Sequence, residues 1–181
     1  MNRFAAFLPL LACVLLATGA FGQAPTHGEM KVFLNEIQPG ALAAPQFCTV
    51  IYADRSFHSE KVDIKQGNAV NRKVYEGQVS ESDWNALIAI VDGKNFQDMK
   101  VPQSVPPLVM QDSHPYTISV ARPKGFQNME FMDNKSLKPY EPQIKPLLQW
   151  WKSFRGKNTT ESSAGPDPQC ALDRSHSVFA Q

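Results

Sequence analysis

Asp112, Ser113 and His114 place a carboxylate, a hydroxyl and an imidazole next to one another in the chain. A serine hydrolase combines these three groups: the histidine accepts the proton of the nucleophile, and the acid orients the histidine. Catalytic triads are, however, assembled from separated positions, and consecutive side chains of an extended segment point in different directions. We therefore interpret this tripeptide as a polar loop that enters a strand. The alternative is a small secreted hydrolase that uses His114 with Asp112 or another nearby acid.

His58 and Glu60 are two residues apart in a segment expected to form a strand, so their side chains share one face of it. Such a pair offers two metal ligands, whereas a zinc site takes three or four. The sequence contains no His-Glu-x-x-His or Cys-x-x-Cys motif that would supply more. The pattern favours a solvated strand face at this pair, and we expect no metal and no other cofactor.

Trp150, Trp151 and Phe154 form an aromatic cluster in a segment with helical spacing. On a helix, Trp151 and Phe154 share the face of Leu147, and Trp150 is rotated away from it by about 100°. An exposed tryptophan can anchor a protein partner or a sugar. The alternative is that Trp150 covers the edge of the core. Trp150 and His114 are accordingly the candidate binding residues.

Residues 1–22 have the order of a secretory signal peptide. A short basic start is followed by the apolar run Phe4–Ala17 and then by small residues. The run is too short for a comfortable membrane span of about 20 residues. We expect cleavage after Ala20 or Gly22, a secreted or periplasmic protein, and no integral membrane segment after cleavage. The alternative is a lipoprotein anchored at Cys13.

Export gives the cysteines a structural meaning. Cys13 leaves with the signal peptide, and Cys48 and Cys170 remain as an even pair in an oxidising compartment. A bridge between them spans 170 minus 48, or 122 positions. In the loop-entropy model such a bridge stabilises the fold by about 4 to 5 kcal/mol. We expect this disulfide; the alternative is a buried Cys48 and a free thiol at Cys170.

The charge balance argues against a polyanionic partner. The 181 residues include 18 Lys plus Arg and 17 Asp plus Glu, a formal net charge of +1. Cleavage after residue 22 removes one basic residue and no acid, which leaves 17 of each. Because nucleic acids and anionic membranes are bound by clustered Lys and Arg, we expect no nucleic-acid partner. The 43% of apolar residues suffice for one folded core.

The elements that would position these residues are hairpins and amphipathic helices. Apolar residues recur with helical spacing from Met30 to Ile37 and favour a short helix there, although a strand also fits. Ser80 and Asp83 form a capping box for a helix that Gly93 closes. A second helix is expected from Glu141–Pro142 to Phe154. Strands are predicted over 46–52, 57–65, 72–79, 116–121 and 126–132.

This order predicts an α+β fold. We expect an antiparallel β-sheet of about five strands, a three-stranded meander plus a hairpin, packed by two amphipathic helices in the order βββαββα. Residues 46–154 would form the single domain, 23–45 an N-terminal extension and 155–181 a flexible C-terminal tail. The proline-rich segment 95–115 would be a long loop of the kind that often carries function.

Three segments carry a family likeness: Phe47–His58, Val74–Ser80, and the late hairpin with its Trp150-Trp151 helix. They are patterns of core and turn residues. Over about Gln46 to Phe154 the chain resembles a family of uncharacterised secreted bacterial proteins, a domain of unknown function. The resemblance implies bacterial export and the fold. The family has no established activity, so no catalytic residue carries over.

Together these observations predict a non-catalytic domain that binds a protein or a component of the cell envelope, through the 95–115 loop or around Trp150. The hydrolase based on His114 is the alternative. A purely structural role is a third hypothesis, which predicts a dimer formed through an apolar face.

Overall fold

The computed structural model describes residues 27–38, 44–65, 68–101 and 115–170. Within these ranges, six strands form one antiparallel sheet in the order β4-β3-β2-β1-β5-β6. The strands are β1 (Met30–Ile37), β2 (Ala44–Tyr52), β3 (Ser56–Lys65), β4 (Asn68–Gln78), β5 (Tyr116–Arg122) and β6 (Gly125–Phe131). The α-helices are α1 (Glu81–Val91), α2 (Lys94–Gln97), α3 (Asn134–Leu137) and α4 (Glu141–Lys157), and the 3-10 turns are η1 (Lys138–Tyr140) and η2 (Pro168–Cys170). The predicted α+β class with an antiparallel sheet is confirmed.

The helix expected over Met30–Ile37 is wrong, because this segment is strand β1 and pairs with both β2 and β5 in the middle of the sheet. Val32 and Leu34 pack under the helices, whereas Phe33 packs on the opposite face. A central strand with two buried faces carries apolar residues next to one another, so it lacks the alternation that marks a half-buried strand. Residues 30–37 therefore belong to the sheet and are not an extension outside it.

The predicted hairpins are confirmed. Strands β2, β3 and β4 form the meander, and β5 pairs with β6. Arg55, in the turn between β2 and β3, adopts the left-handed conformation with φ of 67°. In the β5–β6 turn the same region is taken by Gly125 with φ of 119°, where a side chain would be strained.

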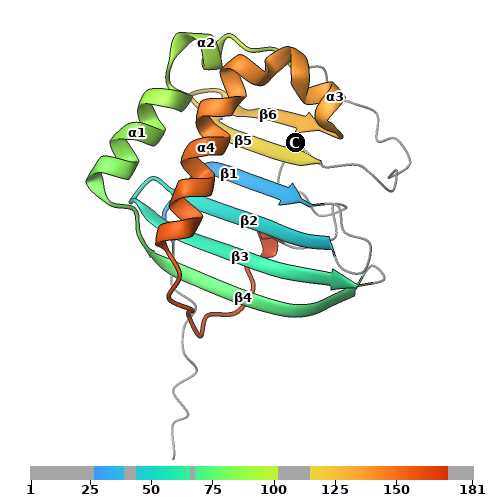
Figure 1. Ribbon diagram of the computed structural model, residues 1–181. Coiled ribbons are helices and arrows are strands. Elements are labelled where there is room, and N and C mark those ends of the chain that lie inside the picture. Colours follow the sequence, from blue (N-terminus) through green and yellow to red (C-terminus); the bar gives the residue numbers. More distant parts are fainter. Residues whose placement is uncertain (1–26, 39–43, 66–67, 102–114, 171–181) are drawn as a thin grey trace, which may run out of the picture.

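Helices α1 and α4 cover one face of the sheet, and α4 runs across the strands (Figure 1). Helix α1 begins where the capping residues predicted it, because the Ser80 hydroxyl accepts a hydrogen bond from the Asp83 backbone N–H at 3.1 Å. Helix α4 begins at Glu141 with Pro142 in its first turn, as expected. No helix in the described part of the chain is long and apolar enough to cross a membrane.

The main core lies between the sheet and these two helices. Leu87 and Val91 come from α1, and Ile144, Leu147 and Trp151 from α4. Their side chains are at most 1% exposed. Burial of each such side chain stabilises the fold by roughly 1.5 to 3 kcal/mol. This packing holds α4 in a fixed position across the strands of the sheet (Figure 1).

The opposite face of the sheet is partly covered by the chain that follows α4. Cys48 of β2 and Cys170 of η2 form a disulfide with a Cα–Cα distance of 5.6 Å, which confirms the predicted pairing. The Ser162 N–H donates to the carbonyl of Val74 in β4 at 2.7 Å. Residues 158–170, expected to belong to a flexible tail, are thus bonded to the sheet, and residues 171–181 lie outside the described ranges.

Candidate functional site

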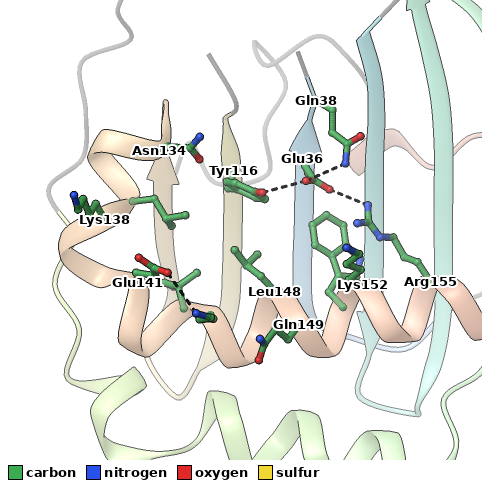
Figure 2. A pocket seen from close by; sticks show the side chains of 14 residues that line it. Glu36, Gln38, Tyr116, Asn134, Lys138, Glu141, Leu148, Gln149, Lys152 and Arg155 are labelled. Atoms are coloured by element: carbon green, nitrogen blue, oxygen red, sulfur yellow. Dashed lines mark hydrogen bonds and ion pairs between the residues drawn. The ribbon is translucent and has the colours of Figure 1, made fainter. Parts of the chain in front are cut away.

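A pocket of about 650 Å³ lies between α4 and the end of the sheet at which the central strand β1 finishes and its neighbour β5 starts (Figure 2). Cavities that bind small molecules commonly have volumes of about 300 to 1,000 Å³. Residues 36 and 38, at the end of β1, line one wall, and Tyr116 contributes from the start of β5. Residues of α3, η1 and α4 form the rest. The size and position make this pocket the candidate binding site of the protein.

The floor of the pocket is apolar. Ile144, Leu148 and Trp151 are spaced at i, i+4 and i+7, so α4 presents them on one face. Leu137 of α3 adds to this surface. The Trp151 ring is fixed from below because its indole N–H donates to the Thr49 hydroxyl of β2 at 2.8 Å. Ile144 and Trp151 are buried, so the apolar surface that a ligand can contact comes from the partly exposed Leu137 and Leu148 above them.

A buried carboxylate stands at the inner wall. Glu36, whose side chain is 6% exposed, accepts hydrogen bonds from the Tyr116 hydroxyl at 3.1 Å and from the Gln38 amide at 3.3 Å. The Arg155 guanidinium donates to its other oxygen at 3.0 Å. Figure 2 shows these three side chains converging on Glu36. A buried charge requires such partners, and Arg155 compensates it directly.

Aromatic rings hold Arg155 in place. Its guanidinium carbon lies 4.1 Å from the centroid of the Phe47 ring and 4.3 Å from that of Trp151. A planar guanidinium between two ring faces gains cation–π attraction and loses little freedom when it also pairs with a carboxylate. The Arg155 side chain is therefore a positioned part of the wall.

The phenol of Tyr116 is held in its protonated form. Burial raises its pKa well above the ordinary value, and the negative charge and hydrogen bond of Glu36 raise it further, while Arg155 acts in the opposite direction. A phenol that keeps its proton continues to donate to Glu36. This polar cluster is thus a fixed network at neutral pH.

The rim is basic. Four basic side chains line the pocket, Lys138, Lys145, Lys152 and Arg155, against two acidic ones, Glu36 and Glu141, an excess of two positive charges. Glu141 pairs with Lys145 at 3.6 Å, and Glu36 pairs with Arg155. Lys138 and Lys152 make no ion pair with any residue in the ranges that the structure describes. Their charges face solvent at the two ends of the pocket (Figure 2).

Trp150, one of the residues proposed from sequence, does not line this pocket. Asp112 and His114 are outside the described residues, so the hydrolase alternative stays a prediction. Trp150 is 9% exposed, its ring stacks on Phe154 at 5.0 Å, and its indole N–H donates to the carbonyl of Asp83 at 3.0 Å. An exposed Trp150 anchor is therefore wrong, and the alternative, that this side chain covers the edge of the core, agrees with the structure.

The solvated face expected at His58 and Glu60 is also wrong. These residues are 2% and 1% exposed, because residues 158–170, called here the C-terminal segment, cover this part of the sheet. His58 Nε2 lies 2.9 Å from Glu60, and His58 Nδ1 lies 3.1 Å from Glu76 of β4. Burial alone lowers the pKa of His58, but the hydrogen bonds to Glu60 and Glu76 outweigh it, and the pKa is raised.

The sequence interpretation missed the pocket because its polar residues are far apart in the chain. One signal was available: Ile144, Leu148, Trp151 and Arg155 continue the same helical spacing. A basic residue that continues an apolar face either extends its charge to solvent or pairs with an acid beside the core. The spacing does not indicate which of the acidic residues that acid is.

A scan against models of known protein families found no match to the chain, and a search of curated proteins found none.

Proposed function

We propose that the protein is an exported, non-catalytic binding domain of the cell envelope, and that its pocket binds a molecule with an apolar body and an anionic group. One observation carries this proposal: a cavity of about 650 Å³ combines an apolar floor on α4 with a rim in which two lysines have no acidic partner among the described residues. Expected export, which follows from residues 1–22, places the ligand among envelope components.

The floor would bind the apolar part. Leu137 and Leu148 are the partly exposed members of the floor, and the buried Ile144 and Trp151 support them from the core. A hydrocarbon chain or ring laid on the two leucines is thereby removed from water. Each buried CH₂ group contributes about 0.8 kcal/mol. Several such groups are needed for affinity in the micromolar range.

The rim would bind the anionic group. The inner cluster is already neutral because the charge of Arg155 compensates Glu36, so it attracts no second anion. Lys138 and Lys152 keep their positive charges at the mouth. A ligand therefore orients with its anionic end toward the lysines and its apolar end along α4. The two acidic side chains of the pocket, Glu36 and Glu141, are already paired with Arg155 and Lys145. Such paired carboxylates suit a binding site better than acid–base catalysis.

Calorimetric titration with two ligands of opposite charge tests the proposal. Decanoate and decyltrimethylammonium share the same apolar chain and are used below their critical micelle concentrations. Decanoate should bind with one-to-one stoichiometry, and the cation should bind at least tenfold more weakly. Equal binding of the two ligands, or no binding of decanoate, would overturn the proposal.

Variants then locate the binding site. Lys138→Gln and Lys152→Gln should each weaken decanoate binding by about two- to fivefold, the range of a solvent-exposed ion pair. Lys124→Gln is the matched control, because Lys124 is an exposed lysine in the β5–β6 turn and does not line the pocket. If all three variants behave like the unaltered protein, decanoate binds somewhere else.

A further inference from the structure

A second group of side chains with metal-ligand chemistry lies on the sheet face opposite α4. His27, just before β1, meets His58 of β3 and Glu76 of β4, and one ligand atom of each lies within 4.8 Å of the other two. His58 Nδ1 is 3.1 Å from Glu76 Oε1, and His27 Nε2 is 3.6 Å from the same oxygen. The sheet thus brings together two imidazoles and a carboxylate from three separate segments.

These separations fit a tetrahedral ion. Zn–N and Zn–O bonds of about 2.0 to 2.2 Å require ligand atoms roughly 3.4 Å apart. The separations of 3.1 Å and 3.6 Å lie on either side of that value. The third separation, between the two imidazole nitrogens, is within 4.8 Å, so a bound ion requires the two histidines to move closer together.

The orientation of the His27 ring suits a cation at this place. Ser56 Oγ donates its proton to Asp54 Oδ1 at 2.6 Å, so it can only accept from His27 Nδ1, which lies 3.3 Å away. Nε2 is therefore the nitrogen that faces Glu76 Oε1, at 3.6 Å. A positive ion between this nitrogen and the carboxylate oxygen can be bound by both.

His58 carries the outer contact that metal-bound histidines usually have. Its second nitrogen, Nε2, lies 2.9 Å from the carboxylate of Glu60. Glu60 in turn accepts from the Asp167 N–H at 2.7 Å and pairs with Arg72. A histidine that donates its other N–H to a carboxylate is fixed in orientation and is a stronger ligand.

The two remaining ligands are supported in the same way. The His27 ring stacks on Tyr52 at a centroid distance of 4.4 Å and an angle of 6°. Glu76 uses its second oxygen to accept from the Ser162 hydroxyl at 3.1 Å, so Oε1 is the oxygen that faces both imidazoles, and a bound ion there takes the place of the His58–Glu76 hydrogen bond. Glu76 and His27 are 20% and 18% exposed, so the site is reached from solvent.

We propose that His27, His58 and Glu76 bind a Zn²⁺ ion, with a water molecule as the fourth ligand. The second oxygen of Glu76 and the outer carboxylate Glu60 are bonded to Ser162 and Asp167 of the C-terminal segment. Bound Zn²⁺ therefore tightens the attachment of that segment to β3 and β4. This site is independent of the α4 pocket, which lies on the other face of the sheet.

Zinc titration of the tag-free mature protein, in competition with a chromogenic chelator, tests this proposal. The unaltered protein should bind one Zn²⁺ per chain, and Co²⁺ at the same site should give the visible absorption of a four-coordinate complex. His27→Gln and Glu76→Gln should each weaken binding at least tenfold. Both side chains are partly exposed, so these variants avoid the buried His58, whose loss endangers folding.

Matched controls separate the site from adventitious binding. His176→Gln removes another histidine, and Glu161→Gln removes an exposed carboxylate of the C-terminal segment that pairs with Lys73. Both should bind Zn²⁺ like the unaltered protein. Ser56→Ala, which removes the partner of His27 Nδ1, should weaken binding by roughly 10- to 100-fold.

Thermal unfolding provides the second readout. Zn²⁺ should raise the Tm of the unaltered protein and of both controls, and should not raise that of folded His27→Gln or Glu76→Gln. The proposal is overturned if no stoichiometric binding occurs. It is also overturned if folded His27→Gln and Glu76→Gln retain the affinity of the unaltered protein.

Discussion

The Arg155 guanidinium lies 3.0 Å from the Glu36 carboxylate and joins the last turns of α4 to the end of β1 across 119 positions of the chain. The pair sets where α4 crosses the sheet and compensates the charge on a carboxylate that is almost fully buried. It therefore links the stability of the fold to the shape of the pocket.

Arg155→Met should lower the free energy of unfolding by about 3 to 5 kcal/mol, because Glu36 is then a buried charge without its counter-ion. The double variant Glu36→Gln/Arg155→Met should be more stable than Arg155→Met alone, since it removes that charge. Urea unfolding followed by circular dichroism measures both. Lys152→Met, an exposed lysine on the same helix, is the control and should change little. Equal, small losses for Arg155→Met and Lys152→Met would contradict the assigned role of Arg155.

Trp150→Phe should destabilise the fold without weakening decanoate binding. It removes the indole N–H that donates to the Asp83 carbonyl and leaves a smaller ring against Phe154, a loss of about 1 to 3 kcal/mol. Trp151→Phe is the matched comparison, because Trp151 lines the pocket and donates to Thr49. It should lower both stability and affinity. A Trp150→Phe protein that loses decanoate affinity would place Trp150 at the binding site after all.

Replacement of both bridged cysteines, Cys48→Ala/Cys170→Ala, should lower the free energy of unfolding by about 2 to 5 kcal/mol. The C-terminal segment should loosen first, because the bridge anchors it to β2. Amide hydrogen exchange reports this directly: the N–H groups of Ser162 and Asp167, bonded to Val74 and Glu60, should exchange faster. Unchanged exchange at both amides would show that hydrogen bonds alone hold the segment.

The Asp83–Lys157 contact predicts a pH dependence. A hydrogen bond from Lys157 at 2.7 Å lowers the pKa of Asp83 below its ordinary value of 3.8; burial opposes this, and a bond from Ser80 adds to it. Because the folded pKa is lowered, the stabilisation is present above the unfolded value and is lost as the pH falls through the folded one. Lys157→Gln should therefore raise the pKa of Asp83 in an NMR titration.

The same variant should reduce the free energy of unfolding at neutral pH by about 0.5 kcal/mol, the size of an exposed ion pair. This difference from the unaltered protein should close in acid, where Asp83 is protonated in both. Lys152→Gln is the control, because Lys152 has no acidic partner among the described residues. This variant should leave the pKa of Asp83 unchanged. A difference in stability that persists below the folded pKa would rule out the ion pair as its cause.

Patterns of apolar and turn residues predicted most helices and strands correctly, because each pattern depends only on which side chains of that one helix or strand are buried. Helix α1 has its capping serine, Ser80, and α4 has a proline, Pro142, in the first turn. Strands β2 to β6 have turn residues at their ends. Strand β1 failed because Val32, Phe33 and Leu34 are buried on two faces, and their spacing also fits a helix.

The polar residues show the limit of this approach. Whether His58 and Glu60 face solvent depends on the C-terminal segment, which begins about one hundred residues later and is tied to β2 by Cys170. No property of strand β3 by itself indicates that cover. The expected solvated face was therefore wrong even though the strand and the shared face of the two side chains were right.

By itself the sequence determined the strands β2 to β6, the helices α1 and α4, the α+β class and the even pair Cys48 and Cys170, because patterns of burial and turn chemistry act over a few residues. Tertiary structure alone decided that β1 lies at the centre of the sheet and that Glu36 meets Arg155 in a pocket. It also decided that His27 and Glu76 meet at His58. These contacts depend on the order of the strands and on the path of α4 across the sheet. Both are set by the packing of segments that are distant in the chain, so the local spacing of residues does not encode them.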